Sequence, residues 1–569
     1  PGWTGLNFNL AVGGSIVRTV KDGADDNPEL SSGFLYARQI ISISDWNTTV
    51  GMKAITNVQG GKDTEPDEFS FNMMGISGKF YMGVDGQWRV QSEQSIKVEY
   101  IGTGSNTYPP FTPPNFTGNP WSGVGNGLYQ GHLAGFILTD ESGTKYEFGG
   151  GNTDYMEYSM EFFNQGRDTW ICNAWYLKSV TTHTGQTINF TYERGDFIAQ
   201  MYFSVYNKAY SVDGNVPVVP FGCSNWSSYI GAFGPYNGKL ISPIYLKSVT
   251  SKNAKIDFIS TVSTELAYDE NIFSPYLDYL LAHPSAGQAN KLDFLPYLFD
   301  CFYPTFVNTS LCNTSTPLNQ LLAKLKWRKL DKIRITNTYD NTIAKEFEFT
   351  YNNIATERLM LQKVQEKASR TSEVINPYEF FYYQYPTITL PHYAKTHTDH
   401  WGFNNGITIN TNTDFNNPST YGTSNRSPAT DSRYQLVGTL NKIKYPTGGF
   451  TEFTFEPHTY SKEVKLNRAL GVDNYAATQL GGGLRINKIR SYDPAISSSV
   501  IEKKLYYVNG FNPLSPDTTL ISSGVLGGKT QYYWSNYRPK PEDDNVTYYE
   551  EIFSTQSVLP STENSLGSH

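Results

Sequence analysis

A short phrase recurs six times along the chain: Leu or Ile, two residues later Lys or Ser, then Val or Ile. The six copies are Leu177–Val180, Leu246–Val249, Leu330–Ile333, Leu361–Val364, Leu440–Ile443 and Ile486–Ile489. Most copies lead through a polar or glycine-containing stretch into alternating apolar residues, as at Phe347, Phe349 and Tyr351. Because a period of two is typical of a half-buried strand, each copy predicts a β-hairpin. Repeated units bury their apolar faces against their neighbours, which predicts an array of antiparallel hairpins.

Composition supports a mainly β protein. The chain holds 41 Tyr and 33 Phe, whereas charged residues are only 17%, and aromatic residues fit the half-buried faces of sheets. The formal net charge is −8, with no cluster of Lys and Arg, which argues against nucleic acid and anionic lipid as partners. No apolar run approaches the roughly 18 to 20 residues that span a bilayer, and the opening residues lack the pattern of a signal peptide.

Changes of pattern divide the chain into four regions. They are a β region over 1–170, hairpin repeats over 171–268, a helical insertion over 269–326, and further hairpin repeats over 327–569. Turn signals such as Ser142-Gly143 are typical of hairpins in the first region. In the third region, Leu residues at spacings of three and four predict short helices that cap or plug the β architecture. The last hairpins are expected to continue beyond the end of the chain.

The chain has four cysteines. Cys301 and Cys312 flank a short segment, and we predict a disulfide between them, which would stabilise the fold by roughly 3 kcal/mol on the loop-entropy estimate. The alternative is that all four are buried free thiols. Spacing does not decide the redox state of Cys172 and Cys223.

A group of histidines near one carboxylate is the sharpest metal candidate. His392, His397 and Asp399, with His400 beside them, offer imidazole and carboxylate ligands for zinc or another transition metal. Their spacing matches no standard metal motif, and on a strand His397 and Asp399 share a face while His400 points away. A structural loop is therefore the competing interpretation, and we favour it.

Carboxylates form two further groups. They are Asp22, Asp25 and Asp26 in the first group, and Glu65, Asp67 and Glu68 in the second. Oxygen ligands of the first kind suit calcium, and paired acids that face each other could hydrolyse glycosides. Neighbouring acids in one turn rarely face each other, which argues against a hydrolase in either group. For the group of Asp22, Asp25 and Asp26, a solvated turn is the simpler alternative to a calcium site.

Loop aromatics provide a hypothesis for binding. Trp121, Trp226, Tyr229 and Tyr236 lie in stretches rich in Gly, Asn and Ser, where rings can stack on sugars or anchor a protein partner. Most aromatics in such a chain belong to sheet faces or to the core, which is the alternative. The chain has no nucleophile elbow, phosphate loop or zinc-type cysteine spacing. We therefore expect no catalytic site and no cofactor.

Several segments, taken in order, resemble the Rhs/YD-repeat family in its secreted bacterial form, which is related to the B-component shells of toxin complexes. The matching segments are Gly2-Trp3, Gly13-Gly14-Ser15-Ile16-Val17-Arg18, Glu65-Pro66-Asp67-Glu68-Phe69, Ser142-Gly143-Thr144-Lys145-Tyr146, Trp175-Tyr176-Leu177, Asp399 with Trp401-Gly402, Tyr445-Pro446-Thr447-Gly448-Gly449 and Gly482-Gly483-Leu484-Arg485. The family's tyrosine-aspartate repeat is degenerate here, with Tyr339-Asp340-Asn341 and Tyr492-Asp493-Pro494 its nearest relatives. The insertion over 269–326 does not match the family pattern.

The resemblance implies a large spiralling β-sheet that closes into a hollow shell around a variable C-terminal passenger, as in toxin carriers. It also implies export by a secretion machinery, with outer-membrane proteins as partners, to the surface or exterior of a Gram-negative bacterium. On this interpretation the region is a non-catalytic scaffold. Two other classes remain open: a surface adhesin that binds glycans or a protein through the loop aromatics, and a polysaccharide hydrolase with two carboxylates across a groove.

Overall fold

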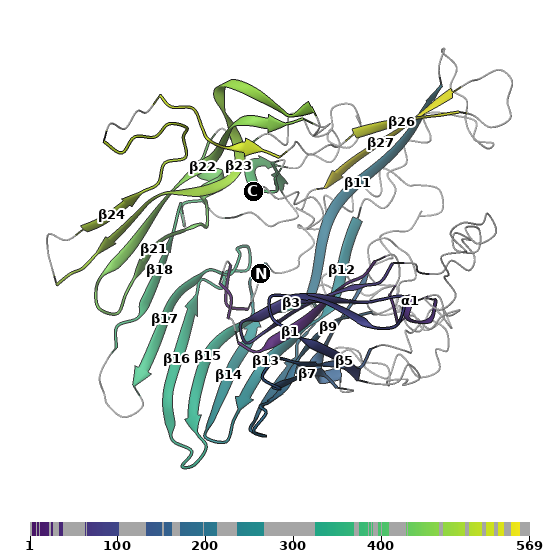
Figure 1. The fold of residues 1–569 in the computed structure, drawn as a ribbon. Helices are drawn as coiled ribbons and strands as arrows, with labels where there is room; N and C mark the ends of the chain where they lie inside the picture. Colours follow the sequence, from purple (N-terminus) through teal and green to yellow (C-terminus); the bar gives the residue numbers. More distant parts are fainter. Residues whose placement is uncertain are drawn as a thin grey trace, which may run out of the picture.

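The computed structural model describes, with short gaps, residues 3–26, 33–37, 63–101, 133–161, 171–212, 236–266, 325–408, 428–465, 470–514, 519–527, 533–539 and 548–557. Its dominant feature is one large, mainly antiparallel sheet of many strands (Figure 1). Helix is limited in these residues to short segments: α1 (Phe34–Ala37), the 3-10 turn η2 (Thr153–Tyr155) and α8 (Arg433–Leu436). The fold class predicted from the alternating aromatic segments is therefore confirmed.

The N-terminal strands meet on the long strand β9. In chain order they are β1 (Gly14–Thr19), β2 (Glu68–Met73), β3 (Ile76–Met82), β4 (Trp88–Ser92), β5 (Lys97–Ile101), β6 (Gly135–Thr139), β7 (Lys145–Gly149), β8 (Met156–Glu161) and β9 (Ile171–Thr181). The first half of β9 pairs with β1 and β8, and its second half pairs with β7 and β10. Strands β2, β3 and β4 continue from β1, whereas β6 and β5 continue from β7. Between these arms, Phe69, Phe80, Phe136 and Trp175 form a fully buried aromatic core.

From β9 the ladder continues through the strands that we call the wall. They are β10 (Thr187–Arg194), β13 (Ile244–Thr250), β14 (Ala254–Ser263), β15 (Trp327–Asn337), β16 (Ile343–Tyr351), β17 (Leu361–Ala368), β18 (Tyr378–Tyr382), β21 (Leu440–Lys444), β22 (Phe450–Val464), β23 (Val472–Tyr492) and β24 (Val500–Lys504). Each of these strands pairs antiparallel with the next. Figure 1 shows that the wall follows a curved path and does not form a flat sheet.

The remaining strands branch from this ladder. They are β11 (Ile198–Val212), β12 (Tyr236–Ser242), β19 (Thr396–Thr398), β20 (Asn404–Thr408), β25 (Val525–Leu526), β26 (Tyr533–Pro539) and β27 (Tyr548–Ser557). Strand β12 pairs with β8 and with the first part of β11, and β27 of the last hairpin pairs with the second part of β11. Strands β19 and β20 form a separate two-stranded sheet. The last described hairpin thus returns to a strand from the first half of the chain.

A β-bulge coincides with each of the six repeated phrases. In the β16–β17 pair, Thr350 lies opposite Lys363 and Tyr351 lies opposite Leu361, so Gln362 has no partner across the ladder. The second residue of the phrase is extra in the same way in the other five copies: Lys178, Lys247, Asp331, Asn441 and Asn487. A bulge bends its strand and increases the local twist. The repeated phrase therefore marks a bend in every second strand from β9 to β23.

Tyrosines fasten neighbouring copies of the phrase to one another. The hydroxyl of Tyr351 donates a 2.9 Å hydrogen bond to the carbonyl of Leu330, the first residue of one copy, while the Tyr351 backbone lies opposite the first residue of the next copy. Tyr192 and Tyr382 occupy the same position in their strands, and their hydroxyls donate to the carbonyls of Leu177 and Leu361. The hydroxyl of Tyr507 donates to the carbonyl of Ile486, the first residue of the last copy. Each such tyrosine links a bend to its neighbour.

The wall has one charged face and one mainly apolar face, which we call the apolar face although it also carries the Lys345–Glu366 pair at 2.9 Å. On β15 and β16, the charged face carries the cross-strand pairs Lys332–Glu348, with N and O 2.6 Å apart, and Arg334–Glu346, at 2.7 Å. The register puts a row of apolar side chains on the other face: Phe258, Ile333, Phe347, Phe349, Val364, Phe380, Ile443, Phe453 and Phe455. From β16 onward these apolar residues are only partly buried. Over this stretch the described residues form a single-layer wall.

An N-terminal strap, residues 3–10, lies across the apolar face. The Trp3 ring is 5.5 Å from that of Tyr245, and the Phe8 ring packs edge-on against Phe380 at 4.9 Å. The Trp3 carbonyl accepts a 2.8 Å hydrogen bond from the N–H of Leu330, the first residue of a bulged phrase. Figure 1 places the N-terminus within the curve of the wall, so the apolar face is the concave one.

Two further predictions from the sequence concern the degenerate family repeat and the helical insertion. Tyr339-Asp340-Asn341, the nearest relative of the family repeat, forms the tip of the β15–β16 hairpin, where Tyr339 is 96% exposed. The predicted helical insertion lies almost wholly outside the described residues, so it stays a prediction, as do the four region boundaries. Within the described part of the chain, no helix has the length and apolar character needed to cross a bilayer.

Candidate functional site: a buried carboxylate cluster

Arg18 is a charged residue at a core position of β1. The strand alternates, so Arg18 faces the same side as Ile16, and its side chain is fully buried. Its backbone lies opposite Phe69 on β2, and its guanidinium lies 5.7 Å from the centre of that ring. A buried guanidinium requires oppositely charged partners. The fold supplies them from two segments far away in the sequence.

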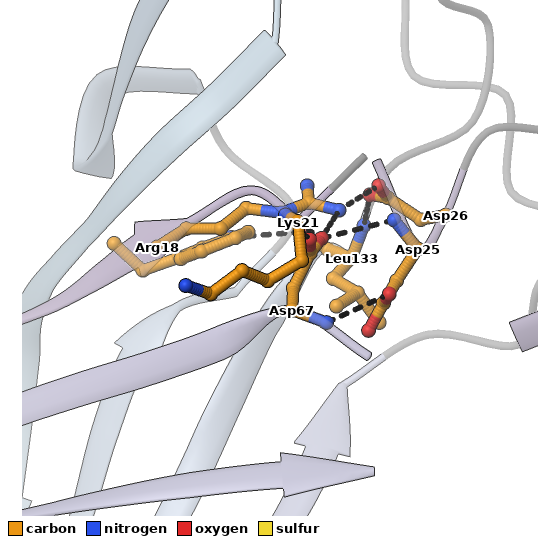
Figure 2. Close-up of polar contacts among 7 residues, drawn as sticks. Arg18, Lys21, Asp25, Asp26, Asp67 and Leu133 are labelled. Atoms are coloured by element: carbon orange, nitrogen blue, oxygen red, sulfur yellow. Dashed lines mark hydrogen bonds and ion pairs between the residues drawn. The ribbon is translucent and has the colours of Figure 1, made fainter. Parts of the chain in front are cut away.

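Three aspartates surround this guanidinium (Figure 2). Arg18 Nε donates to Asp67 Oδ2 at 2.6 Å, and Arg18 Nη2 donates to Asp26 Oδ1 at 2.7 Å. Asp25 and Asp67 exchange backbone bonds: the Asp25 N–H donates to Asp67 Oδ2 and the Asp67 N–H donates to Asp25 Oδ1, each at 2.9 Å. The N–H of Lys21 donates to Asp67 Oδ1 at 2.8 Å. The cluster therefore joins β1, the turn at residues 24–26 and the start of β2.

The cluster is also tied to the aromatic core. The N–H of Leu133 donates to Asp26 Oδ2, and the carbonyl of Leu133 accepts a bond from Trp175 Nε1, both at 2.7 Å. Trp175 packs against Gly149, where a Cβ atom would lie 2.7 Å from the indole Cδ1. Gly149 has φ +70, a conformation that glycine adopts at little cost. Segments that carried the family resemblance, including those with Arg18, Asp67 and Trp175, thus converge here.

Burial dominates the electrostatics of the cluster. Asp25 and Asp67 are 0% exposed and Asp26 is 3% exposed. Loss of solvation raises the pKa of Asp25 to about 8, with a further rise from the negative charge of Asp67 and an opposing effect from Arg18. Burial also raises the pKa of Asp67, although Arg18 and the backbone N–H groups oppose it. Such a cluster can hold a proton, but its carboxylates are closed off from a substrate.

The structure separates the two predicted carboxylate groups into buried and surface members. Asp25, Asp26 and Asp67 meet in the cluster, whereas Glu65 is exposed and Glu68 pairs with Lys79 on the surface at 2.8 Å. Asp22 lies outside the described residues. The Arg18 guanidinium occupies the position between the carboxylates that a cation would need, so a calcium site at this cluster is not favoured.

Asp399 organises a turn. Its Oδ1 accepts bonds from the backbone N–H groups of Trp401 and Phe403, each at 2.9 Å. Gly482 lies against this turn, where a Cβ atom would be 2.5 Å from Trp401 Cε3. Two further segments of the resemblance are thus in contact. These contacts support the structural interpretation of Asp399.

The histidines of the predicted metal group have no described side chains. His392 and His400 lie outside the described residues, and His397 lies on β19 with its side chain not described. Among the described residues, no group of three or more His, Cys, Asp or Glu side chains is arranged to hold a metal ion. The metal hypothesis for His392, His397 and Asp399 therefore gains no support.

The predicted disulfide and binding loops fall largely on the same undescribed parts. Cys301, Cys312, Cys223, Trp121, Trp226 and Tyr229 all lie outside the described residues, and Tyr236 begins β12 with its side chain not described. The disulfide and the aromatic binding loops therefore stay predictions. Cys172 on β9 is a buried free thiol, and burial raises its pKa well above the ordinary value.

Sequence reasoning missed that the two carboxylate groups meet around Arg18. The relevant signal was present in β1, where the alternation of Ile16, Val17 and Arg18 puts an arginine on the apolar side. A buried arginine requires acidic partners. Asp67, 49 residues further along the chain, could be recognised as such a partner only once β1 was paired with β2.

Comparisons with known proteins give weak likenesses. No family model matches the sequence, and no curated protein sequence matches it. Twelve solved chains match in structure. A crystal structure titled TcdB2-TccC3-TEV is 10% identical, with a TM-score of 0.28, over 91% of this chain and 20% of that chain. The N-terminal domain of the effector protein SpvB from Salmonella typhimurium strain LT2 is 11% identical, with a TM-score of 0.22, over 64% of this chain and 90% of that domain.

A third likeness is to a Photorhabdus luminescens Tc holotoxin pore, at 10% identity and a TM-score of 0.19, over 76% of this chain and 19% of that chain. The chain spans about a fifth of the length of the TcdB2-TccC3 chain. At these identities and TM-scores the likenesses assign no family, and the function proposed below is argued from the wall itself.

Proposed function

We propose that this protein is a non-catalytic β-shell scaffold whose concave wall holds or presents a polypeptide passenger. The observation that carries the proposal is the division of the wall into a charged face and a concave, mainly apolar face. An apolar face that is only partly buried in a single-layer sheet is a surface for contact with another chain. The passenger proposed is the C-terminal region that the sequence resemblance implies.

Curvature supports the same proposal. Bends at every second strand, marked by residues such as Gln362 and Asn441, curl the wall around its apolar side. The charged side carries cross-strand pairs such as Lys367–Glu348, at 2.6 Å, which suits a face in water. A wall of this kind encloses an apolar space while it presents a polar exterior.

Among the residues that the structure describes, no observation favours the other two function classes. A hydrolase needs two accessible carboxylates, and of the carboxylates singled out in the sequence, Asp25 and Asp67 are 0% exposed. An adhesin would use the loop aromatics, which lie almost entirely outside the described residues. The proposal also includes secretion to the cell surface or beyond, with the export machinery or outer-membrane proteins as partners. This part rests on the sequence resemblance.

A pair of adjacent substitutions on β16 tests the proposal in the native full-length product. Phe349 faces the concave side and Thr350 faces the charged side. We expect the wild-type protein to protect a polypeptide from outside residues 1–569 against added protease. Because a buried Phe contributes about 1.5 to 3 kcal/mol, Phe349→Lys should speed digestion of that polypeptide by about tenfold or more, and Thr350→Lys should not.

The readout is mass spectrometry of the protected fragments, together with the unfolding midpoint of each variant. Cryo-EM of the wild-type product shows whether the wall surrounds polypeptide density. A wild-type product with no protected polypeptide and no enclosed density would refute the proposal. Equal digestion rates for the two variants at equal stability would refute the assigned role of the apolar face.

A further inference from the structure

The cluster around Arg18 holds more negative charge than one guanidinium can balance. Asp25, Asp26 and Asp67 are each at most 3% exposed, and the side chain of Asp63 nearby is also buried. If all three aspartates of the cluster were ionised beside Arg18, the buried volume would carry an excess of two negative charges. Like charges at close range in a poorly solvated site do not ionise together. The geometry therefore requires a proton.

Asp25 is the member best suited to carry that proton. Both oxygens of Asp67 and both oxygens of Asp26 accept hydrogen bonds from Arg18 or from backbone N–H groups. Asp25 Oδ1 accepts the N–H of Asp67, whereas the buried Asp25 Oδ2 has no hydrogen-bond partner among the described residues. An ionised oxygen without a donor is the costliest arrangement in the cluster.

Other groups that face Asp25 do not compensate for its charge. Arg18 on β1 is already bound to Asp67 and Asp26. Lys21 contributes its backbone N–H, and Figure 2 shows its amino group directed away from the carboxylates. Cys172 on β9 also lies near Asp26 and Arg18, with its thiol kept neutral by burial. The ionisation of Asp25 would thus add an unbalanced charge.

We propose that Asp25 is a proton-operated clasp, which when protonated holds the turn at residues 24–26 against β1 and β2 and when ionised releases it. The turn is anchored to these strands by the reciprocal Asp25–Asp67 bonds and by the Asp26–Arg18 pair. Release frees Asp26, which also holds Leu133 and through it the contact with Trp175. The clasp therefore couples pH to the junction between β1, β2 and the aromatic core.

The direction of the effect follows from linkage. The pKa of Asp25 is raised from 3.8 to about 8 in the folded protein. At pH values between about 4 and 8, Asp25 is therefore protonated when the clasp is closed and ionised when it is open. The stability of the closed form is therefore greatest below about pH 4 and falls until about pH 8, above which it levels off. The clasp tightens in acid and loosens in mild alkali.

Hydrogen exchange measured by mass spectrometry on the full chain tests this proposal. Peptides covering residues 14–26 and 67–73 report the local opening equilibrium once intrinsic rates are corrected for pH. In wild type this equilibrium should rise by about tenfold per pH unit from about pH 5 to about pH 8 and then level off. In Asp25→Asn, which keeps the shape but cannot ionise, it should stay low and flat.

Asp85→Asn is the matched control, because Asp85 is an exposed turn carboxylate far from the cluster in sequence and bound to Arg89. This variant should keep the wild-type slope. Local peptides separate the clasp from Glu265, whose pKa burial raises to about 7 elsewhere in the chain. If Asp25→Asn does not fold, the pH slope of the opening equilibrium is compared between wild type and Asp67→Asn. The Asp67→Asn variant keeps an ionisable Asp25, so it should retain a slope. A flat wild-type profile, an Asp25→Asn variant with the full slope, or a slope abolished only in Asp67→Asn would overturn the proposal.

Discussion

At the scale of single residues, Arg18 holds together segments that the chain keeps apart. It binds Asp67, which is 49 residues away, and Asp26, which is 8 residues away, in a fully buried position. Asp26 in turn accepts a hydrogen bond from the N–H of Leu133, which lies 107 residues further along the chain. The N-terminal region thus depends on one side chain that no hydrophobic residue can replace without leaving buried carboxylates unpaired.

We expect Arg18→Leu to lower the free energy of unfolding of this region by about 3 to 5 kcal/mol, because it removes one partner of a buried ion pair. Urea titration followed by Trp fluorescence measures the loss. Arg89→Leu serves as the control, since Arg89 and its partner Asp85 are about half exposed and such pairs contribute little. Equal shifts in the two variants would contradict the role given to Arg18.

How far the sequence could predict this cluster depends on the distance between its parts. The alternation of Ile16, Val17 and Arg18 is local, so the buried arginine could be inferred from β1 alone. The meeting of Asp25 with Asp67 spans 42 residues and depends on the β1–β2 register. A solvated turn was the simpler expectation for the group of Asp22, Asp25 and Asp26, and that expectation was wrong for Asp25 and Asp26, which are buried.

At the scale of elements, the hairpins were predictable and their bends were not. The alternation of Phe347, Phe349 and Tyr351 can be recognised in a single segment of the sequence, and these residues do lie on β16. A bulge is defined by two residues opposite one, so Gln362 becomes extra only when Tyr351 is known to lie opposite Leu361. The phrase could be found in the sequence, but its geometry required the partner strand.

Deletion of Gln362 tests the link between the phrase and the bend. Leu361 and Lys363 already lie opposite Tyr351 and Thr350, so the deletion makes this part of the ladder regular without turning any later side chain to the other face. We expect a folded protein with a locally flatter wall, visible by cryo-EM.

Deletion of Gln365 on the same strand is the control. Gln365 has a regular partner, Glu348, so its loss forces a one-residue slip that reverses the faces of the adjoining part of the strand. This variant should be poorly folded. If the Gln362 deletion kept the full local bend, the bulge would not be its cause.

At the scale of the whole molecule, the N-terminal strap braces the wall. Gly5 has φ +95, and a Cβ atom there would lie 3.2 Å from the backbone nitrogen of Leu361. The strap thus approaches the wall at a bulged phrase, with Trp3 bound to a second phrase at Leu330 and Phe8 packed on Phe380. One short segment therefore spans β13 to β18 on the concave side.

We expect Gly5→Ala to lift the strap and to speed hydrogen exchange of peptides in β15 and β17. Gly75→Ala is a close control, because Gly75 has φ +90 but nothing within 4 Å of its added Cβ. Both variants bear the backbone strain of a positive φ, and only Gly5→Ala adds the steric contact. Equal exchange in β15 and β17 for both variants would show that the strap does not brace the wall.

The placement of one bend in every second strand has a consequence for how such a wall changes in size. Each hairpin carries its own increment of curvature, together with the tyrosine that fastens it in three of the internal strands. A gene duplication that adds one hairpin would lengthen the arc while leaving its radius nearly constant. The length of the wall, and with it the space on its concave side, can therefore change by whole hairpins.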